Sequence, residues 1–226
     1  MFSHQPPLSS RLRPVGGTGL GRPILRLPAA GFVAGTMVET DAGWQPVETL
    51  AIGQPVQTWD GGLQPLVRLE RRRIAPGAGL VAVPGGVLST CSDLVLLPGQ
   101  HVLVGTGAAA ALLDQDVALV PAAALLGWQG VRVERPRRGF DVVGLAFETE
   151  EVVYANTGAM LHCAAAEAAA GAVPQSEFFT VLDRDRARAL LGFAPAPIDP
   201  TPVAATAAAT GPARVVPLAA GTARAA

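Results

Sequence analysis

Apolar residues between positions 31 and 193 occur in short runs, and turn-forming residues interrupt these runs at short intervals. Typical interruptions are Asp60-Gly61-Gly62 and Pro98-Gly99, where glycine supplies the backbone freedom that tight turns need. Strand-sized runs between such turns predict a meander of β-hairpins with longer returns. The predicted strands are residues 36–40, 45–47, 55–58, 66–73, 80–83, 93–97, 102–104, 117–121, 130–133, 142–147 and 152–155.

Helical patterns are sparse in this chain. The segments that favour helix are residues 47–50, 122–126, 164–170 and 184–191. The last is the best defined, because Asp183 precedes it as an N-cap and Gly192 follows it. No repeat with a period of roughly 20–50 residues is present, which argues against a solenoid or propeller. The pattern therefore predicts one all-β domain with few short helices.

The two ends of the chain differ in composition from its middle. Residues 1–30 are rich in Gly, Pro, Ser and Arg, and residues 194–226 contain no aromatic residue and one acidic residue. Segments of this kind bury too little apolar surface to offset chain entropy. We therefore predict a disordered leader (1–30), a folded domain (31–193) and a disordered Ala/Pro-rich tail (194–226).

Composition narrows the function classes. Of the 226 residues, 50% are hydrophobic and 15% are charged, which excludes wholesale disorder. The net charge is -1 and all 17 basic residues are arginine, so we predict no nucleic-acid partner. Cys91 and Cys163 are too few for a disulfide framework. His162 and Cys163 are adjacent without a second ligand pair, so we predict no metal or other cofactor.

The first 30 residues also bear on the compartment. They contain several prolines and lack the apolar run of a Sec signal peptide. Elsewhere the longest apolar stretches are broken before the roughly 20 residues that a membrane helix needs. We expect a monomer with no transmembrane segment, cytoplasmic by default. Signal-peptide-independent export and an unknown protein partner stay open.

Three blocks of sequence carry a family resemblance. Residues 31–58 read GFVAGTMVETDAGWQPVETLAIGQPVQT, residues 97–104 read LPGQHVLV, and residues 151–156 read EVVYAN. These blocks resemble Hint domains, the fold shared by Hedgehog autoprocessing domains and inteins. The first block is similar to the bacterial form C-F-x-x-G-T-x-I-x-T-x-x-G-x-x-P-V-E-x-L-x-x-G-D-x-V-x-T. The resemblance implies a disc of antiparallel hairpins built from two pseudo-symmetric halves over about residues 31–192.

The resemblance also implies a reaction and the positions that carry it. An active relative begins with a Cys or Ser that attacks the preceding carbonyl, and only the first residue can reach that carbon. Here that position is Gly31, which has no side chain, so the scissile bond would be Ala30–Gly31. A T/S-x-x-H pair then protonates the departing nitrogen. His101 stands at the His position, and Pro98 offers no hydroxyl three residues before it.

Two further residues occupy family positions. Thr36 belongs to the turn into the first strand, and the family geometry implies that Gly31 and Thr36 lie near His101. Asn156 is the candidate for the terminal asparagine of a splicing domain, but the chain continues for more than 60 residues beyond it. Protein splicing is therefore not expected.

The leading hypothesis is a Hint domain that has lost self-cleavage and acts as a folded module, with a link to secreted or surface proteins implied by the resemblance. One alternative is residual autoproteolytic processing assisted by His101 and Asn156. Another is a β-rich ligand-binding or adhesion domain. Two arginine runs, residues 71–73 and 135–138, are interpreted as exposed hairpin edges that resist aggregation, with contact to an anionic partner as the alternative.

Overall fold

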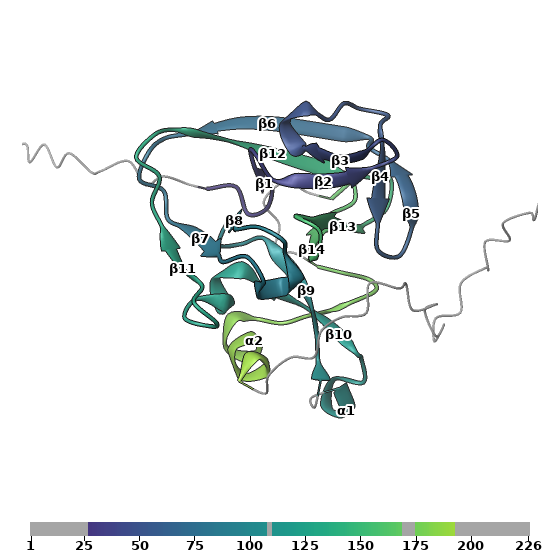
Figure 1. The fold of residues 1–226 in the computed structure, drawn as a ribbon. Coiled ribbons are helices and arrows are strands. Elements are labelled where there is room, and N and C mark those ends of the chain that lie inside the picture. The colour runs from purple at the N-terminus through teal and green to yellow at the C-terminus, as the bar shows by residue number, and fades with distance from the viewer. Residues whose placement is uncertain (1–26, 108–109, 169–174, 193–226) are drawn as a thin grey trace, which may run out of the picture.

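The computed structural model describes residues 27–107, 110–168 and 175–192, and these residues form two β-sheets (Figure 1). One sheet has six strands, which pair antiparallel throughout. In spatial order these strands are β11 (Arg132–Glu134), β7 (Leu80–Val83), β8 (Leu94–Leu96), β1 (Phe32–Val33), β12 (Phe140–Ala146) and β6 (Arg68–Ile74).

The second sheet has nine strands, which are antiparallel apart from the parallel pair β10–β15. Eight of them follow one path, and β3 (Gly43–Pro46) pairs with β2 beside that path. The path runs through β15 (Thr180–Val181), β10 (Val117–Pro121), β9 (His101–Gly105), β14 (Ala159–Cys163), β13 (Glu151–Ala155), β2 (Met37–Thr40), β4 (Pro55–Thr58) and β5 (Gly62–Pro65).

Helices in the described ranges are short. They are η1 (Val47–Thr49), η2 (Val87–Ser89), α1 (Ala110–Leu113), η4 (Ala122–Leu125) and α2 (Arg184–Leu191). As predicted, α2 begins after Asp183, whose side chain accepts a hydrogen bond from the Arg186 amide at 2.9 Å. Its apolar residues Leu190 and Leu191 are buried, and α2 packs against η4 and β10. No helix in the described part of the chain is long and apolar enough to cross a bilayer.

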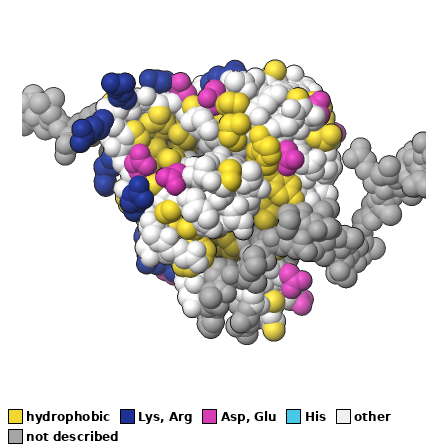
Figure 2. All heavy atoms as spheres, viewed as in Figure 1, with side chains coloured by type: hydrophobic (Ala, Val, Ile, Leu, Met, Phe, Trp, Pro, Cys, Tyr) yellow, Lys and Arg dark blue, Asp and Glu magenta, His cyan; other side chains and the backbone are white. Residues whose placement is uncertain are grey.

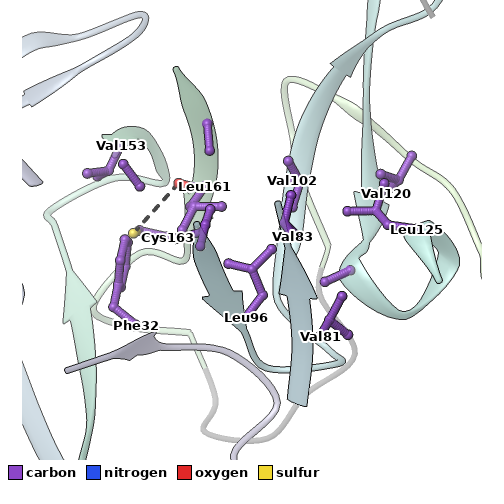
Figure 3. Close-up of a cluster of buried hydrophobic side chains, with 14 of the residues drawn as sticks. Phe32, Val81, Val83, Leu96, Val102, Val120, Leu125, Val153, Leu161 and Cys163 are labelled. Carbon is purple, nitrogen blue, oxygen red and sulfur yellow. Dashed lines mark hydrogen bonds between the residues drawn. The ribbon is translucent and has the colours of Figure 1, made fainter. Parts of the chain in front are cut away.

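The core contains residues of both sheets. Phe32, Val81 and Leu96 come from the six-stranded sheet, and Val102 and Leu161 come from the nine-stranded sheet. Figure 3 shows these side chains converging on one another. Each of them is at most 2% exposed. The core therefore joins the two sheets.

The all-β prediction is confirmed, and the predicted strands correspond to observed ones. Four observed strands were not predicted: β1, β5, β14 and β15. β1 and β15 have only two residues each, which is too short for an alternating pattern to show. β5 is short and contains Gly62 and Pro65, and β14 is buried along its whole length, so neither alternates clearly. The helix predicted for residues 164–170 is wrong where the structure describes it. Ala165 bridges to Phe147 there, and the Ala166 amide donates to the Phe147 carbonyl at 2.8 Å.

The predicted leader and tail lie largely outside the described residues. Only residues 27–30 of the leader belong to the described ranges. Leu27 is partly buried and packs against the small apolar cluster that contains Leu97 and Val142.

Phe32 tests how far the fold depends on the two-residue strand β1. It pairs with Leu96 of β8 and Val143 of β12, and it is 2% exposed. Phe32→Ala is expected to lower the free energy of unfolding by about 3–5 kcal/mol, because it leaves a cavity where the two sheets meet. Urea denaturation followed by circular dichroism measures the change.

The control for this prediction is Phe178→Ala, which deletes the same atoms from a side chain that is 59% exposed. It should change the stability by no more than about 0.5 kcal/mol. Equal effects of the two substitutions would contradict the placement of Phe32 in the core.

Candidate functional site

The amide nitrogen of Gly31 is held by a buried glutamine. Gly31 N–H donates to Oε1 of Gln100 at 2.9 Å, and Gln100 is fully buried. The Nε2 group of Gln100 donates to the carbonyl oxygens of His162 at 2.8 Å and His101 at 3.1 Å. One carboxamide therefore connects the start of β1 to β9 and β14, which lie in the other sheet.

Little room remains for a side chain at Gly31. Its φ is +139°, a value that residues with a Cβ rarely adopt. A Cβ at this position would lie 2.7 Å from Cγ1 of Val142, 3.3 Å from the Val143 carbonyl oxygen and 3.7 Å from Cδ1 of Leu97. A nucleophile at position 31 would need both a backbone adjustment and a shift of Val142.

The residues before Gly31 are also packed against the domain. A Cβ at Gly99 would collide with the carbonyl oxygen of Ala29. Glycine at position 99 thus lets the chain before the Ala30–Gly31 bond lie directly on the turn that precedes β9. Both sides of this bond are held by the segment between β8 and β9.

His101 begins β9 and is 7% exposed. Its Nδ1–H donates to the Gly99 carbonyl oxygen at 3.0 Å, because that oxygen can only accept. Burial, together with the neighbouring His162, lowers the pKa of His101 to about 4. The imidazole is therefore neutral at pH 7.

The position of Gln100 changes how the second sequence block is interpreted. Among the described residues it is Gln100, and not the adjacent His101, that bonds the Gly31 nitrogen. The residue three positions before Gln100 is Leu97, whose side chain borders Gly31. Position 100 therefore carries a carboxamide, and position 97 carries an apolar side chain. Sequence reasoning missed Gln100 because it searched for residue types that transfer protons.

Asn156 has a fully engaged side chain. Its Oδ1 accepts from the Met37 amide at 2.9 Å, and its Nδ2 donates to Ser92 Oγ at 3.1 Å and to the Asp93 carbonyl at 2.9 Å. The Asn156 carbonyl accepts from the Cys91 amide at 3.1 Å. These bonds join the β13–β14 turn to β2 and to the loop before β8. Asn156 and Gly31 share no hydrogen bond among the described residues.

Thr36 completes the turn between β1 and β2. Its hydroxyl donates to the Val33 carbonyl oxygen at 2.7 Å, and its own carbonyl accepts from the Val47 amide at 2.9 Å. Thr36 is buried, at 5% exposure. Its hydroxyl is therefore committed to the turn.

A partly buried glutamate, Glu150, links His162 to the C-terminal segment. Oε2 of Glu150 accepts from His162 Nε2–H at 3.0 Å, and these side chains are 10% and 5% exposed. Oε1 accepts from Ser176 Oγ at 2.8 Å, the Glu177 amide at 2.9 Å and the Phe178 amide at 3.2 Å. The turn at residues 176–178 leads into β15 and α2, so Glu150 attaches this segment to the domain.

The charge of Glu150 is favoured by these contacts. Burial alone raises the pKa of its carboxyl group, but the hydrogen bonds from His162 and Ser176 outweigh burial and hold the pKa below its usual value. His162 is shared by two networks, because its carbonyl accepts from Gln100 while its imidazole binds Glu150.

The other thiol, carboxyl and metal-ligating side chains in the described ranges do not form a second candidate site. Burial raises the pKa of the Cys163 thiol well above its ordinary value, so the thiolate is disfavoured. Burial also raises the pKa values of Asp60 and Glu151, whose carboxyl groups lie close enough to interact. Among the residues that the structure describes, no group of three or more His, Cys, Asp or Glu side chains is arranged to hold a metal ion.

The chain belongs to the Hint domain family, because the family model for the Hint domain matches residues 30–161. The match confirms the resemblance inferred from the sequence blocks. The matched region includes Gly31, Gln100, His101 and Asn156 and ends before His162. No match was found among curated proteins.

Solved structures similar to this chain are inteins and an intein-like domain. The bacterial intein-like domain from Clostridium thermocellum is 16% identical, with a TM-score of 0.46, over 59% of this chain and 98% of that one. The AceL NrdHF class 3 split intein is 13% identical, with a TM-score of 0.41, over 61% and 99% of the two chains. The MchDnaB-1 intein is 16% identical, with a TM-score of 0.34, over 57% and 98%.

Gly31→Ala measures the crowding at the start of β1. The new Cβ would meet Val142, so we expect a loss of stability about 1–3 kcal/mol larger than at an uncrowded glycine that also has a positive φ. Gly35→Ala is the matched control, because Gly35 has φ +91° and a Cβ added there would meet no atom within 4 Å. Equal losses in urea denaturation would contradict the close packing at Gly31.

Glu150→Gln tests the attachment of the C-terminal segment. A group whose pKa is lowered by folding stabilises the fold above its unfolded-state pKa, and this stabilisation is lost as the pH falls through the folded-state pKa. At pH 7 the free energy of unfolding of the variant should be about 1.5–3 kcal/mol lower than that of the wild type, because charge-assisted hydrogen bonds are lost. The difference should shrink in acid, below the ordinary pKa of glutamate.

Glu148→Gln provides the control for the Glu150 experiment, because Glu148 is exposed and lies two residues away. It should leave the stability unchanged at each pH. Urea denaturation across a pH series measures both variants. A pH-independent difference for Glu150→Gln would contradict a role for the carboxylate charge.

Proposed function

We propose that this chain is a Hint domain that does not cleave itself and that works as a folded module. The observation that carries the proposal is the hydrogen bond from the Gly31 amide to the buried Gln100 carboxamide. A side-chain amide donates and accepts hydrogen bonds but does not titrate in the physiological range, so it cannot supply a proton to a departing nitrogen. Gly31 supplies no nucleophile either.

The surroundings of this bond support the same proposal. His101 is neutral, and its Nδ1 proton is directed to the Gly99 carbonyl oxygen. The Asn156 carboxamide is held by partners on β2 and on the loop before β8, so an attack on its own carbonyl would require their loss. The side chain of Leu97 gives the Ala30–Gly31 region an apolar neighbour, which cannot polarise the amide.

A Hint domain of this kind keeps the polypeptide before residue 31 covalently attached. Its function is then that of a stable body, residues 31–193, against which Ala29 packs at Gly99 and whose first residue, Gly31, is held by the Gln100 bond. An association with secreted or surface proteins, implied by the family resemblance, belongs to this proposal. Residual autoproteolysis is the outcome that would replace it.

Intact-mass spectrometry of the full chain tests the proposal. The purified protein is incubated at neutral pH with dithiothreitol, which cleaves a thioester, or with hydroxylamine, which cleaves a thioester or an ester. We expect a single species with the mass of the whole chain, because position 31 cannot form either intermediate. A fragment that begins at Gly31 and that forms only from the folded protein would overturn the proposal.

Two controls make a positive result interpretable. Fragmentation that persists in denaturant would be independent of the fold and would leave the proposal standing. If cleavage needs the folded protein, His101→Ala and Asn156→Ala show whether these residues assist it. Loss of cleavage in either variant would establish residual processing.

A further inference from the structure

A group of exposed arginines lies on one edge of the six-stranded sheet. We define the basic rim as Arg132 on β11 and Arg135, Arg137 and Arg138 in the connection from β11 to β12. All four residues are exposed. Figure 2 shows Lys and Arg side chains, all of them arginine here, along the border of the molecule where Figure 1 places β11 and the start of β12.

The rim contrasts with the charge of the rest of the domain. The described ranges hold 11 arginines and 17 acidic residues, a net charge of −6. Residues 132–138 hold four arginines and one acid, Glu134, a net charge of +3. Within the described part of the chain, no ion pair or hydrogen bond uses the guanidinium groups of the rim. Four such cations on an acidic body create a local site for anionic groups.

The rim lies beside an open strand edge. β11 is the terminal strand of its sheet and pairs with β7 alone, in the register Val133 to Val81. A terminal strand keeps one row of backbone N–H and C=O groups unpaired. Val133 is 44% exposed, so an apolar side chain accompanies these groups. Backbone donors and acceptors, one apolar contact and flanking cations therefore occur together.

The connection that carries three of the arginines is held in place. The Pro136 carbonyl accepts from the Gly77 amide at 2.9 Å. A Cβ at Gly139 would lie 2.9 Å from the Ile74 carbonyl oxygen, so the chain passes close to the end of β6 at that point. Residues 135–138 are thus attached to the sheet on both sides, and their arginines project from a fixed backbone.

We propose that β11 and the basic rim bind an extended acidic peptide, which adds to the sheet as a further strand. Main-chain hydrogen bonds to the open edge of β11 supply affinity, and the four guanidinium groups select carboxylate side chains. An extended peptide fits better than a nucleic acid, because a sugar-phosphate chain cannot pair with strand N–H and C=O groups in register. The acidic surface beyond the rim would also repel a long polyanion. The inference does not depend on the loss of self-cleavage.

Fluorescence anisotropy with the full chain tests this proposal. The probe is a fluorescein-labelled peptide of alternating valine and glutamate, titrated with the protein at low salt. Saturable binding is expected, and it should weaken as salt is added. Absence of saturable binding overturns the proposal.

Matched variants locate the peptide. Arg137→Ser with Arg138→Ser removes two charges from the rim, and Arg184→Ser with Arg188→Ser removes two exposed charges from α2. The rim variant should bind the peptide about tenfold or more weakly, the effect of losing about 1.4 kcal/mol of binding free energy. The α2 variant should change the affinity less than about twofold. Equal losses in the two variants would show non-specific attraction and overturn the site, provided that circular dichroism shows both folded.

Two further probes distinguish strand addition from charge attraction alone. A peptide of the same sequence with an N-methyl group on every residue keeps its carboxylates but has no backbone N–H to donate from either edge, so it cannot complete a strand ladder. It should bind about tenfold more weakly, because main-chain hydrogen bonds supply affinity in this mode of recognition. A single-stranded oligonucleotide of similar charge should not bind with comparable affinity. Equal binding of the methylated peptide or of the oligonucleotide would overturn the proposal.

Discussion

The buried carboxamide of Gln100 is the interaction on which the arrangement of the two sheets around Gly31 depends. A fully buried polar side chain must find partners for both its oxygen and its nitrogen. Gln100 meets this requirement with Gly31 on one side and with the carbonyls of His101 and His162 on the other. Because β1 lies in one sheet and β9 and β14 lie in the other, the same three bonds that satisfy the amide also fix the first strand in the fold.

This constraint also connects the stability of the site to its chemistry. The Gly31 amide receives a neutral acceptor, and the absence of a Cβ at Gly31 lets Val142 and Leu97 close around it. Glycine and glutamine therefore support each other as a packed, hydrogen-bonded pair. Replacing only one of them with a reactive group would leave a clash at Val142 or a buried polar group without its partner. If self-cleavage is lost as proposed, its restoration would require coordinated changes in several neighbours.

The sequence predicted more of the fold than of the site. Alternating apolar runs bounded by turns predicted most strands, because successive side chains of a strand point to opposite faces of a sheet. Gln100 was not predicted as a site residue, because its role comes from contacts with Gly31 and His162, which lie 69 and 62 residues away. The hydrogen bonds that Glu150 makes to His162 and to residues 176–178 were not predicted for the same reason. Local patterns carry no information about which distant carbonyl a buried side chain will meet.

The arginines at the two edges of the six-stranded sheet show why charge has to be assessed together with its partners. On β6, Arg71 donates to the carbonyls of Glu48 and Leu50, and Arg73 pairs with Asp141 at 3.0 Å. These guanidinium groups hold that edge against neighbouring segments. The arginines of the rim have no corresponding partner within the described ranges, although they lie at an equally open edge. A role limited to keeping strands apart accounts for charge on both edges, but only the rim retains donors that are free to select a ligand.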